Sequence, residues 1–257
     1  MPRLAQTVYG MQGRLPPLVI AHGLFGSGRN WRAIARALGR DRAVVTVDMR
    51  NHGASFHDAD HSYAAMADDL ARTVAEIGCE VDLLGHSMGG KAAMALALTA
   101  PDCLRRLIVA DIAPVAYGHS HAGHIAAMRA LALDRLSSRA EADAALDHAG
   151  IADAPTRAFL LQNLMLAETP RRWLLNLDAL EQAMPQLVGW PALSGLFDGP
   201  ALFLSGAMSD YVLSDHRPKI QALFPQARFE AIADAGHWLH AQQPRAVIAA
   251  IDGFLSA

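Results

Sequence analysis

The sequence has few cysteines, little net charge and no cluster of basic residues, and each shortage excludes a class of protein. Two cysteines, Cys79 and Cys103, in 257 residues are too few for a disulfide framework or a structural metal site. We therefore expect two buried thiols in a reducing, cytoplasmic environment. A net charge of −3 without Lys/Arg clusters argues against a nucleic-acid partner.

Long apolar runs are also missing. Hydrophobic residues make up 52% of the chain and charged residues 18%, which is typical of a globular protein rather than a disordered one. No stretch of about 18 apolar residues occurs, so we expect no transmembrane helix and no membrane partner. Residues 1–17 lack the apolar core of a signal peptide. The length suits one α/β domain that carries an insertion.

Short apolar runs alternate with helical segments over most of the chain. Such runs predict buried strands at 16–23, 43–49, 81–87, 104–112, 200–206 and 228–236. Periodicity and composition predict helices at 30–38, 63–77, 88–100, 214–224 and 244–256. Strands that alternate with helices indicate an α/β fold, with a mainly parallel sheet covered by helices on both faces.

The alternation lapses between residues 114 and 197, where we expect several helices and no strand. We therefore divide the chain into a core, residues 1–113 and 198–257, and an inserted helical cap, residues 114–197. Ligands bind at the carboxyl ends of the strands in open α/β sheets. A cap that leaves the core at this edge would cover the site.

A Gly-x-Ser-x-Gly pattern, Gly-His-Ser-Met-Gly at residues 85–89, stands between a predicted strand and a predicted helix. This context is the one that a nucleophile elbow requires. A sharp strand-to-helix turn forces an unusual backbone at Ser87, and side chains at positions 85 and 89 would collide with neighbouring backbone. The pattern predicts that Ser87 is a nucleophile.

A serine hydroxyl needs a base that accepts its proton. His237, which follows the last predicted strand, is the candidate base. The other histidines are expected to be ordinary packing or surface residues. Those between positions 57 and 124 have no cysteine or carboxylate at ligand spacing, so we expect no metal and no cofactor.

Acyl transfer also requires donors for the carbonyl oxygen as it becomes negative. The N–H group of Met88, the residue after the nucleophile, is one candidate. The second is expected in the loop after the first predicted strand, His-Gly-Leu-Phe-Gly-Ser at 22–27. The Leu24 N–H is the preferred donor there, and the Phe25 N–H is the alternative.

These residues, in the chain order Ser…Asp…His, resemble the α/β-hydrolase superfamily. The likeness to YbfF-type esterases and their mitochondrial relatives is carried by five segments, HGLFGS (22–27), DMRNHGAS (48–55), GHSMGGKAAM (85–94), VADIAPVAY (109–117) and AGHWLHAQQP (235–244). The resemblance implies an α/β-hydrolase fold under a small helical cap. It also implies hydrolysis of short acyl esters or thioesters.

Two aspartates compete for the role of the acid that orients His237. Asp210 follows the strand after the cap, where most of the superfamily has its acid, and it is our preferred candidate. Asp111 ends the strand before the cap, a position that some relatives use. Both stay open at this point.

The resulting prediction is a serine hydrolase, of the carboxylesterase or thioesterase kind, acting on short- to medium-chain acyl substrates through an acyl-enzyme. Candidate substrate-binding residues are the aromatic side chains Phe25, Tyr117, Trp190, Tyr211 and Trp238. A C–C bond hydrolase or a haloperoxidase-like enzyme on the same scaffold is the alternative, since fold does not fix chemistry. A ligand receptor without catalytic activity is the alternative from another class.

Overall fold

The six predicted strands and one further strand, β1, form a seven-stranded sheet in the computed structural model, which describes residues 2–11, 13–78 and 80–256. The order across the sheet is β1-β3-β2-β4-β5-β8-β9. Neighbouring strands are parallel, except that β1 (Ala5–Tyr9) runs antiparallel to β3 (Val44–Asp48). The remaining strands are β2 (Leu18–Ala21), β4 (Val81–His86), β5 (Leu104–Ala110), β8 (Ala201–Gly206) and β9 (Ala227–Ile232).

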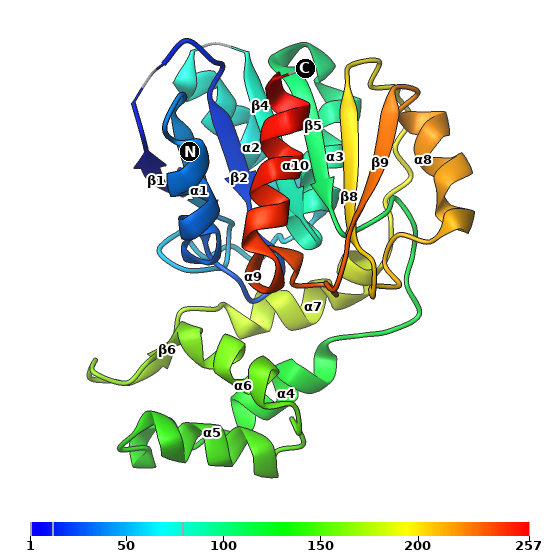
Figure 1. Cartoon of the computed structure of the whole chain (residues 1–257). Helices are drawn as coiled ribbons and strands as arrows, with labels where there is room; N and C mark the ends of the chain where they lie inside the picture. Colours follow the sequence, from blue (N-terminus) through cyan, green and yellow to red (C-terminus); the bar gives the residue numbers. More distant parts are fainter. Residues whose placement is uncertain (1, 12, 79, 257) are drawn as a thin grey trace.

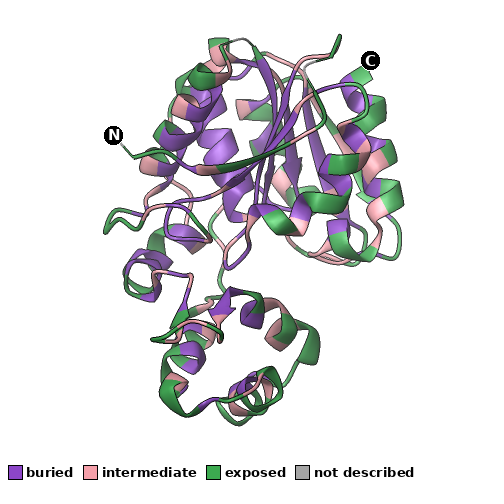
Figure 2. Ribbon diagram, turned by 90° about the vertical axis from the view of Figure 1, so that its left-hand side faces the viewer, coloured by how far each residue is buried: buried purple, intermediate pink, exposed green. Residues whose placement is uncertain are grey.

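Helices cover both faces of this sheet, because every residue of central strands such as β2 and β4 is buried and needs an apolar layer on each side (Figures 1 and 2). One face carries α1 (Arg32–Leu38) and α10 (Pro244–Ser256), with the short α9 (Leu239–Gln242) before α10. The opposite face carries α2 (Tyr63–Ile77), α3 (Met88–Thr99) and α8 (Arg217–Leu223). The α/β architecture predicted from the alternation is confirmed.

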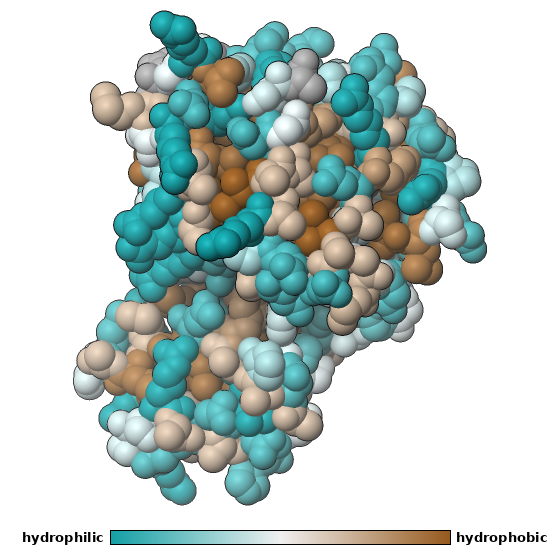
Figure 3. Space-filling model, viewed as in Figure 1, coloured by the Kyte–Doolittle hydropathy of each residue, from teal (hydrophilic) through white to brown (hydrophobic). Residues whose placement is uncertain are grey.

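Between β5 and β8 the chain forms a separate helical layer beyond the carboxyl ends of the strands (Figure 1). Its helices are α4 (Ala122–Ala130), α5 (Arg139–His148), α6 (Ala154–Leu160) and α7 (Leu177–Val188). In the space-filling view this layer projects from the core, and hydrophobic residues are exposed on both parts among hydrophilic ones (Figure 3). The helical layer lies at the edge of the sheet where an α/β fold binds its ligand.

Three strands escaped prediction. β1 has no buried residue, so an apolar run does not mark it, and it is held by pairing with β3. The expectation of no strand between 114 and 197 is wrong for β6 (Leu164–Met165) and β7 (Arg172–Trp173), which pair as a two-residue antiparallel ladder. Strands of two residues are too short to show the alternation of apolar and polar residues by which a sequence predicts a strand.

The expectation that the cysteines are buried is not met by Cys103. Cys103 is only half-buried, and its thiol donates to the carbonyl of Ala100 at 3.0 Å. Cys79 lies outside the described residues.

Candidate active site

Ser87 stands at the sharp turn between β4 and α3. Its backbone has φ 53° and ψ −120°, a region that L-residues rarely adopt. A Cβ atom at Gly85 would lie 2.2 Å from the Gly89 carbonyl oxygen, and one at Gly89 would lie 2.5 Å from that of His22. Only glycine fits at position 85, two residues before the serine, and at position 89, two residues after it. The tight backbone on both sides therefore holds the Ser87 side chain in one place.

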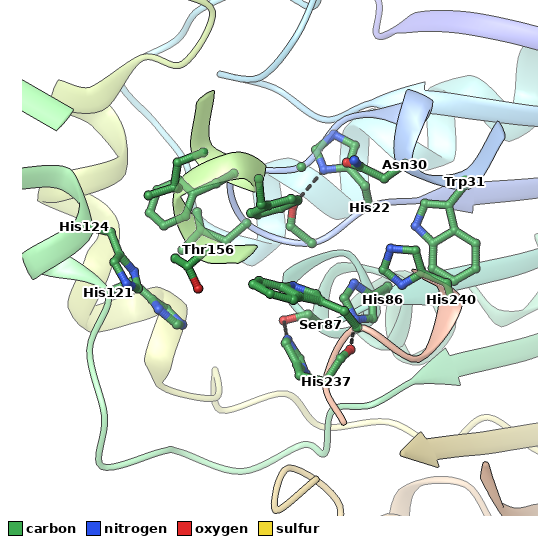
Figure 4. A pocket seen from close by; sticks show the side chains of 17 residues that line it. His22, Asn30, Trp31, His86, Ser87, His121, His124, Thr156, His237 and His240 are labelled. Atoms are coloured by element: carbon green, nitrogen blue, oxygen red, sulfur yellow. Dashed lines mark hydrogen bonds between the residues drawn. The ribbon is translucent and has the colours of Figure 1, made fainter. Parts of the chain in front are cut away.

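His237 connects this serine, beside which it lies in Figure 4, to the buried carboxylate of Asp111. Its Nε2 lies 3.0 Å from the Ser87 Oγ, and its Nδ1 lies 2.7 Å from the Asp111 Oδ2. Because a carboxylate accepts, the Nδ1–H is the donor, and Nε2 is left to accept the serine proton. Asp111 is fully buried, and a carboxylate in this position can stabilise a protonated imidazole ring.

Asp111, rather than Asp210, is therefore the aspartate that contacts His237. Asp111 ends β5 in a left-handed conformation, φ 52°. Its Oδ1 accepts from the Gly206 N–H at 3.0 Å, and its Oδ2 accepts from the Ser209 hydroxyl at 2.6 Å. Asp210 is exposed, and no hydrogen bond of the described chain joins it to His237. The preference for Asp210 does not agree with this geometry.

Two backbone N–H groups beside Ser87 are available for an oxyanion. Within the described chain, neither the Leu24 nor the Met88 N–H has a hydrogen-bond acceptor. Met88 is the first residue of α3, where the helix leaves N–H groups unsatisfied and the helix dipole favours negative charge. The alternative donor, the Phe25 N–H, is already bonded to the His52 Nε2 at 3.2 Å. The geometry thus favours Leu24 over Phe25.

Two buried histidines shape this loop, and sequence reasoning missed both. The Nδ1–H of His22 donates to the Gly23 carbonyl at 2.7 Å, and its Nε2 accepts from the Met49 N–H at 2.9 Å. His52 donates from Nδ1 to a backbone carbonyl and accepts from Phe25. Burial lowers the pKa of His22 to about 4 and that of His52 to about 3, so both are neutral at pH 7. The His-Gly pairs at 22–23 and 52–53 were the available signal.

A cavity of about 210 Å³ opens beside Ser87 (Figure 4). The predicted residues Phe25 and Trp238 line it, together with side chains from the cap that were not predicted. His121, His124 and Thr156 lie on one side of Ser87 in Figure 4. The rest of the wall includes His22, Leu24, Asn30, Trp31, His86, Phe159, Leu160, His237 and His240.

A second, smaller cavity of about 30 Å³ also reaches Ser87. Of the remaining predicted aromatic residues, Tyr117 and Tyr211 line it, whereas Trp190 lines neither cavity. The Tyr211 ring stacks on His237, with ring centroids 4.1 Å apart and planes 20° apart. Tyr211 thus restrains the imidazole from the side while Asp111 fixes it in the ring plane.

The described residues form neither a metal-ion cluster nor a membrane-spanning helix. No group of three or more His, Cys, Asp or Glu among them is arranged to hold a metal ion. None of the helices in the described ranges is both long and apolar enough to cross a bilayer.

Comparison with known proteins adds a family and named relatives. The sequence profile described as alpha/beta hydrolase fold matches residues 16–244. The chain is 41% identical to the esterase YbfF of Escherichia coli K12, over 93% of each chain. It is also 41% identical to the mouse protein named sn-1-specific diacylglycerol lipase ABHD11, over 94% of this chain and 81% of the relative. A solved structure titled "Marine microorganism esterase" matches with a TM-score of 0.93 and 38% identity, over 99% of this chain and all of the other.

Proposed function

The chain belongs to the alpha/beta hydrolase fold family, and from this premise we propose that it cleaves carboxylic esters through an acyl-enzyme on Ser87. The chain is an ester hydrolase, as its likeness to the esterase YbfF and the diacylglycerol lipase ABHD11 indicates. The observation that carries the mechanism is the unbroken hydrogen-bond path from Ser87 Oγ through His237 to Asp111.

In the first half-reaction the Ser87 oxygen attacks the ester carbonyl while His237 Nε2 takes its proton. The N–H groups of Leu24 and Met88 stabilise the oxyanion of the tetrahedral intermediate. His237 then gives its proton to the leaving alcohol, and the acyl group stays on Ser87.

The second half-reaction repeats these steps with water. His237 removes a proton from the water, which attacks the acyl carbonyl, and the acid leaves as Ser87 regains its proton. Asp111 stays ionised throughout and stabilises the protonated ring.

The substrates we propose are esters or thioesters with a short- to medium-chain acyl group. The two cavities at Ser87 have volumes of about 210 Å³ and 30 Å³. Both lie below the roughly 300–1,000 Å³ of sites that take drug-sized ligands.

The cytoplasmic location that we expect from the low cysteine content stays a prediction.

The test is hydrolysis of p-nitrophenyl acetate, butyrate, octanoate and laurate by the wild type and by Ser87→Ala. We expect the wild type to prefer the short chains and the variant to lose several orders of magnitude in kcat. A fluorophosphonate should label the wild type covalently and leave Ser87→Ala unlabelled. Full activity in Ser87→Ala, or labelling of the variant at the wild-type rate, would contradict the proposal.

A further inference from the structure

Lys91 is a buried amine one helical turn beyond the nucleophile, and burial lowers its pKa to about 7. It is one of two lysines in the chain, and only 1% of its surface is exposed. A charged side chain in such a place needs partners that replace water. Its Nζ donates to three consecutive carbonyls, at 3.4 Å for Leu187, at 3.2 Å for Val188 and at close range for Gly189.

These carbonyls belong to the C-terminal end of the cap helix α7 and the residue that follows it. The last carbonyls of a helix have no partner within the helix, and they form the negative end of its dipole. An ammonium group placed there donates hydrogen bonds to these carbonyls and also neutralises the negative end of the helix dipole. Lys91 therefore ties a helix of the cap to α3, the helix that begins immediately after Ser87.

Other donors hold the same helix end. The Tyr63 hydroxyl donates to the Leu187 carbonyl at 2.7 Å, and the Tyr117 N–H donates to the Val188 carbonyl at 2.9 Å. The Lys91 Nζ also lies over the Tyr117 ring, 4.8 Å from its centroid. The end of α7 is thus fixed by α2, by α3 and by the segment that leads into the cap.

The fixed helix end forms part of the wall of the smaller cavity at Ser87. Lys91, Leu187 and Val188 all line that cavity, which has a volume of about 30 Å³. A water molecule requires roughly 10–15 Å³ of such space, so the cavity has room for about two water-sized groups. A small shift of α7 away from α3 would enlarge it by a large fraction.

The positions of His237 and the oxyanion donors indicate which part of an ester enters each cavity. The leaving oxygen must lie near His237, which protonates it, and His237 lines only the larger of the two cavities. The alcohol part of the ester therefore fits the 210 Å³ cavity. The acyl part is left with the smaller cavity, beside Met88 and Lys91.

We propose that Lys91 determines acyl-chain specificity, because it anchors the end of α7 and thereby keeps the acyl cavity small. This inference rests on the proposed function at Ser87. Lys91 acts through the helix that it positions and takes no part in the chemical steps.

The experiment measures kcat/KM for p-nitrophenyl acetate, propionate, butyrate, hexanoate and octanoate. The variants are Lys91→Met, which keeps the apolar stem and loses the ammonium group, and Lys91→Ala. Lys219→Ala is the control, because Lys219 is the other lysine, is exposed on α8, and acts on Lys91 through its charge, which lowers the Lys91 pKa; its removal favours the charged form of Lys91 and leaves that anchor in place. We expect the ratio of octanoate to acetate activity to rise at least tenfold in Lys91→Ala and less in Lys91→Met. Lys219→Ala should keep the wild-type ratio.

Two further measurements separate specificity from general damage. Tyr63→Phe removes the hydroxyl that donates to the Leu187 carbonyl at the end of α7. We expect it to raise the ratio of octanoate to acetate activity by less than Lys91→Ala does. A series of acetate esters with longer alcohols should give the same relative rates in Lys91→Ala as in the wild type. A parallel loss on all acyl chains, or an unchanged ratio in both Lys91 variants and in Tyr63→Phe, would overturn the inference. Inactivity of the wild type towards every ester would instead contradict the proposed function.

Discussion

Acidification will destabilise the fold through its buried histidines, among them His22 and His52. Burial lowers their pKa values to about 4 and about 3, whereas a histidine of the unfolded chain titrates near 6.5. Below pH 6.5 the unfolded chain therefore binds more protons than the folded chain. The free energy of unfolding is thus unaffected by these two groups above pH 6.5, and it falls as the pH drops from 6.5 towards their folded pKa values.

The size of this effect follows from the pKa difference. A pH of 5 lies about 1.5 units below the unfolded pKa of a histidine and above the folded pKa of both His22 and His52. Each group therefore lowers the free energy of unfolding by about 2 kcal/mol at this pH. His22 and His52 together should lower the free energy of unfolding by about 4 kcal/mol between pH 8 and pH 5. This is a large part of the roughly 5–15 kcal/mol that stabilises a folded domain.

Urea denaturation at pH 8, 7, 6 and 5, followed by circular dichroism, measures the effect. His52→Gln keeps an acceptor for the Phe25 N–H but cannot titrate, so its loss of stability between pH 8 and pH 5 should be about 2 kcal/mol smaller than that of the wild type. His148→Gln, at an exposed position on α5, should behave as the wild type does. The same pH dependence in His52→Gln and the wild type would refute the reasoning.

Two more predictions concern the backbone and the support of the site. Ser209→Ala removes the hydroxyl that lies 2.6 Å from Asp111, and kcat for an ester should fall about tenfold with little change in KM; an unchanged kcat in steady-state assays would show that the contact is dispensable. Gly89→Ala would place a Cβ 2.5 Å from a backbone carbonyl, so it should lower the free energy of unfolding by about 2–3 kcal/mol. A melting temperature equal to that of the wild type would contradict the second prediction.

The parts of the site that depend on local sequence were predictable. A Cβ at Gly85 would meet the Gly89 carbonyl within the turn, and one at Gly89 would meet the carbonyls of Ala21 and His22 at the end of β2. His237 lies in the loop after the last strand. The six strands predicted from apolar runs are all present. Central strands such as β2 and β4 are buried along their whole length and therefore need residues that are apolar on both faces, whereas β9 at the edge has one buried residue. β1 was missed because its burial pattern is that of an edge strand with no buried residue.

The choice of acid depended on geometry that no single segment contains. β5 and β8 are neighbours in the sheet, so the loops after them come together, and each carries an aspartate. Asp111 is the one in contact because its left-handed backbone and the Gly206 and Ser209 donors hold its carboxylate beside His237. Sequence order reveals the two loops but not these contacts.

The cavity wall could be predicted only in part. Phe25 and Trp238 stand next to the proposed oxyanion donor Leu24 and the proposed base His237, and both line the larger cavity. His121, His124 and Phe159 enter it from the cap, and their places depend on how the cap helices pack over the sheet. Helical periodicity predicts that such helices exist but does not give the angle at which they cross the core.

The most direct test of the catalytic assignment compares Asp111→Asn with Asp210→Asn in the hydrolysis of p-nitrophenyl acetate. Gly206 and Ser209 donate to different oxygens of Asp111, so an asparagine at position 111 can keep only one of these two bonds through its single carbonyl oxygen. It also cannot stabilise the charged form of His237 or fix the tautomer that the reaction needs. We predict that Asp111→Asn lowers kcat by about 10⁴-fold, as expected when a triad acid is replaced by its amide, and that Asp210→Asn stays within about twofold of the wild type. A large loss in Asp210→Asn with near-normal kcat in Asp111→Asn would contradict the account.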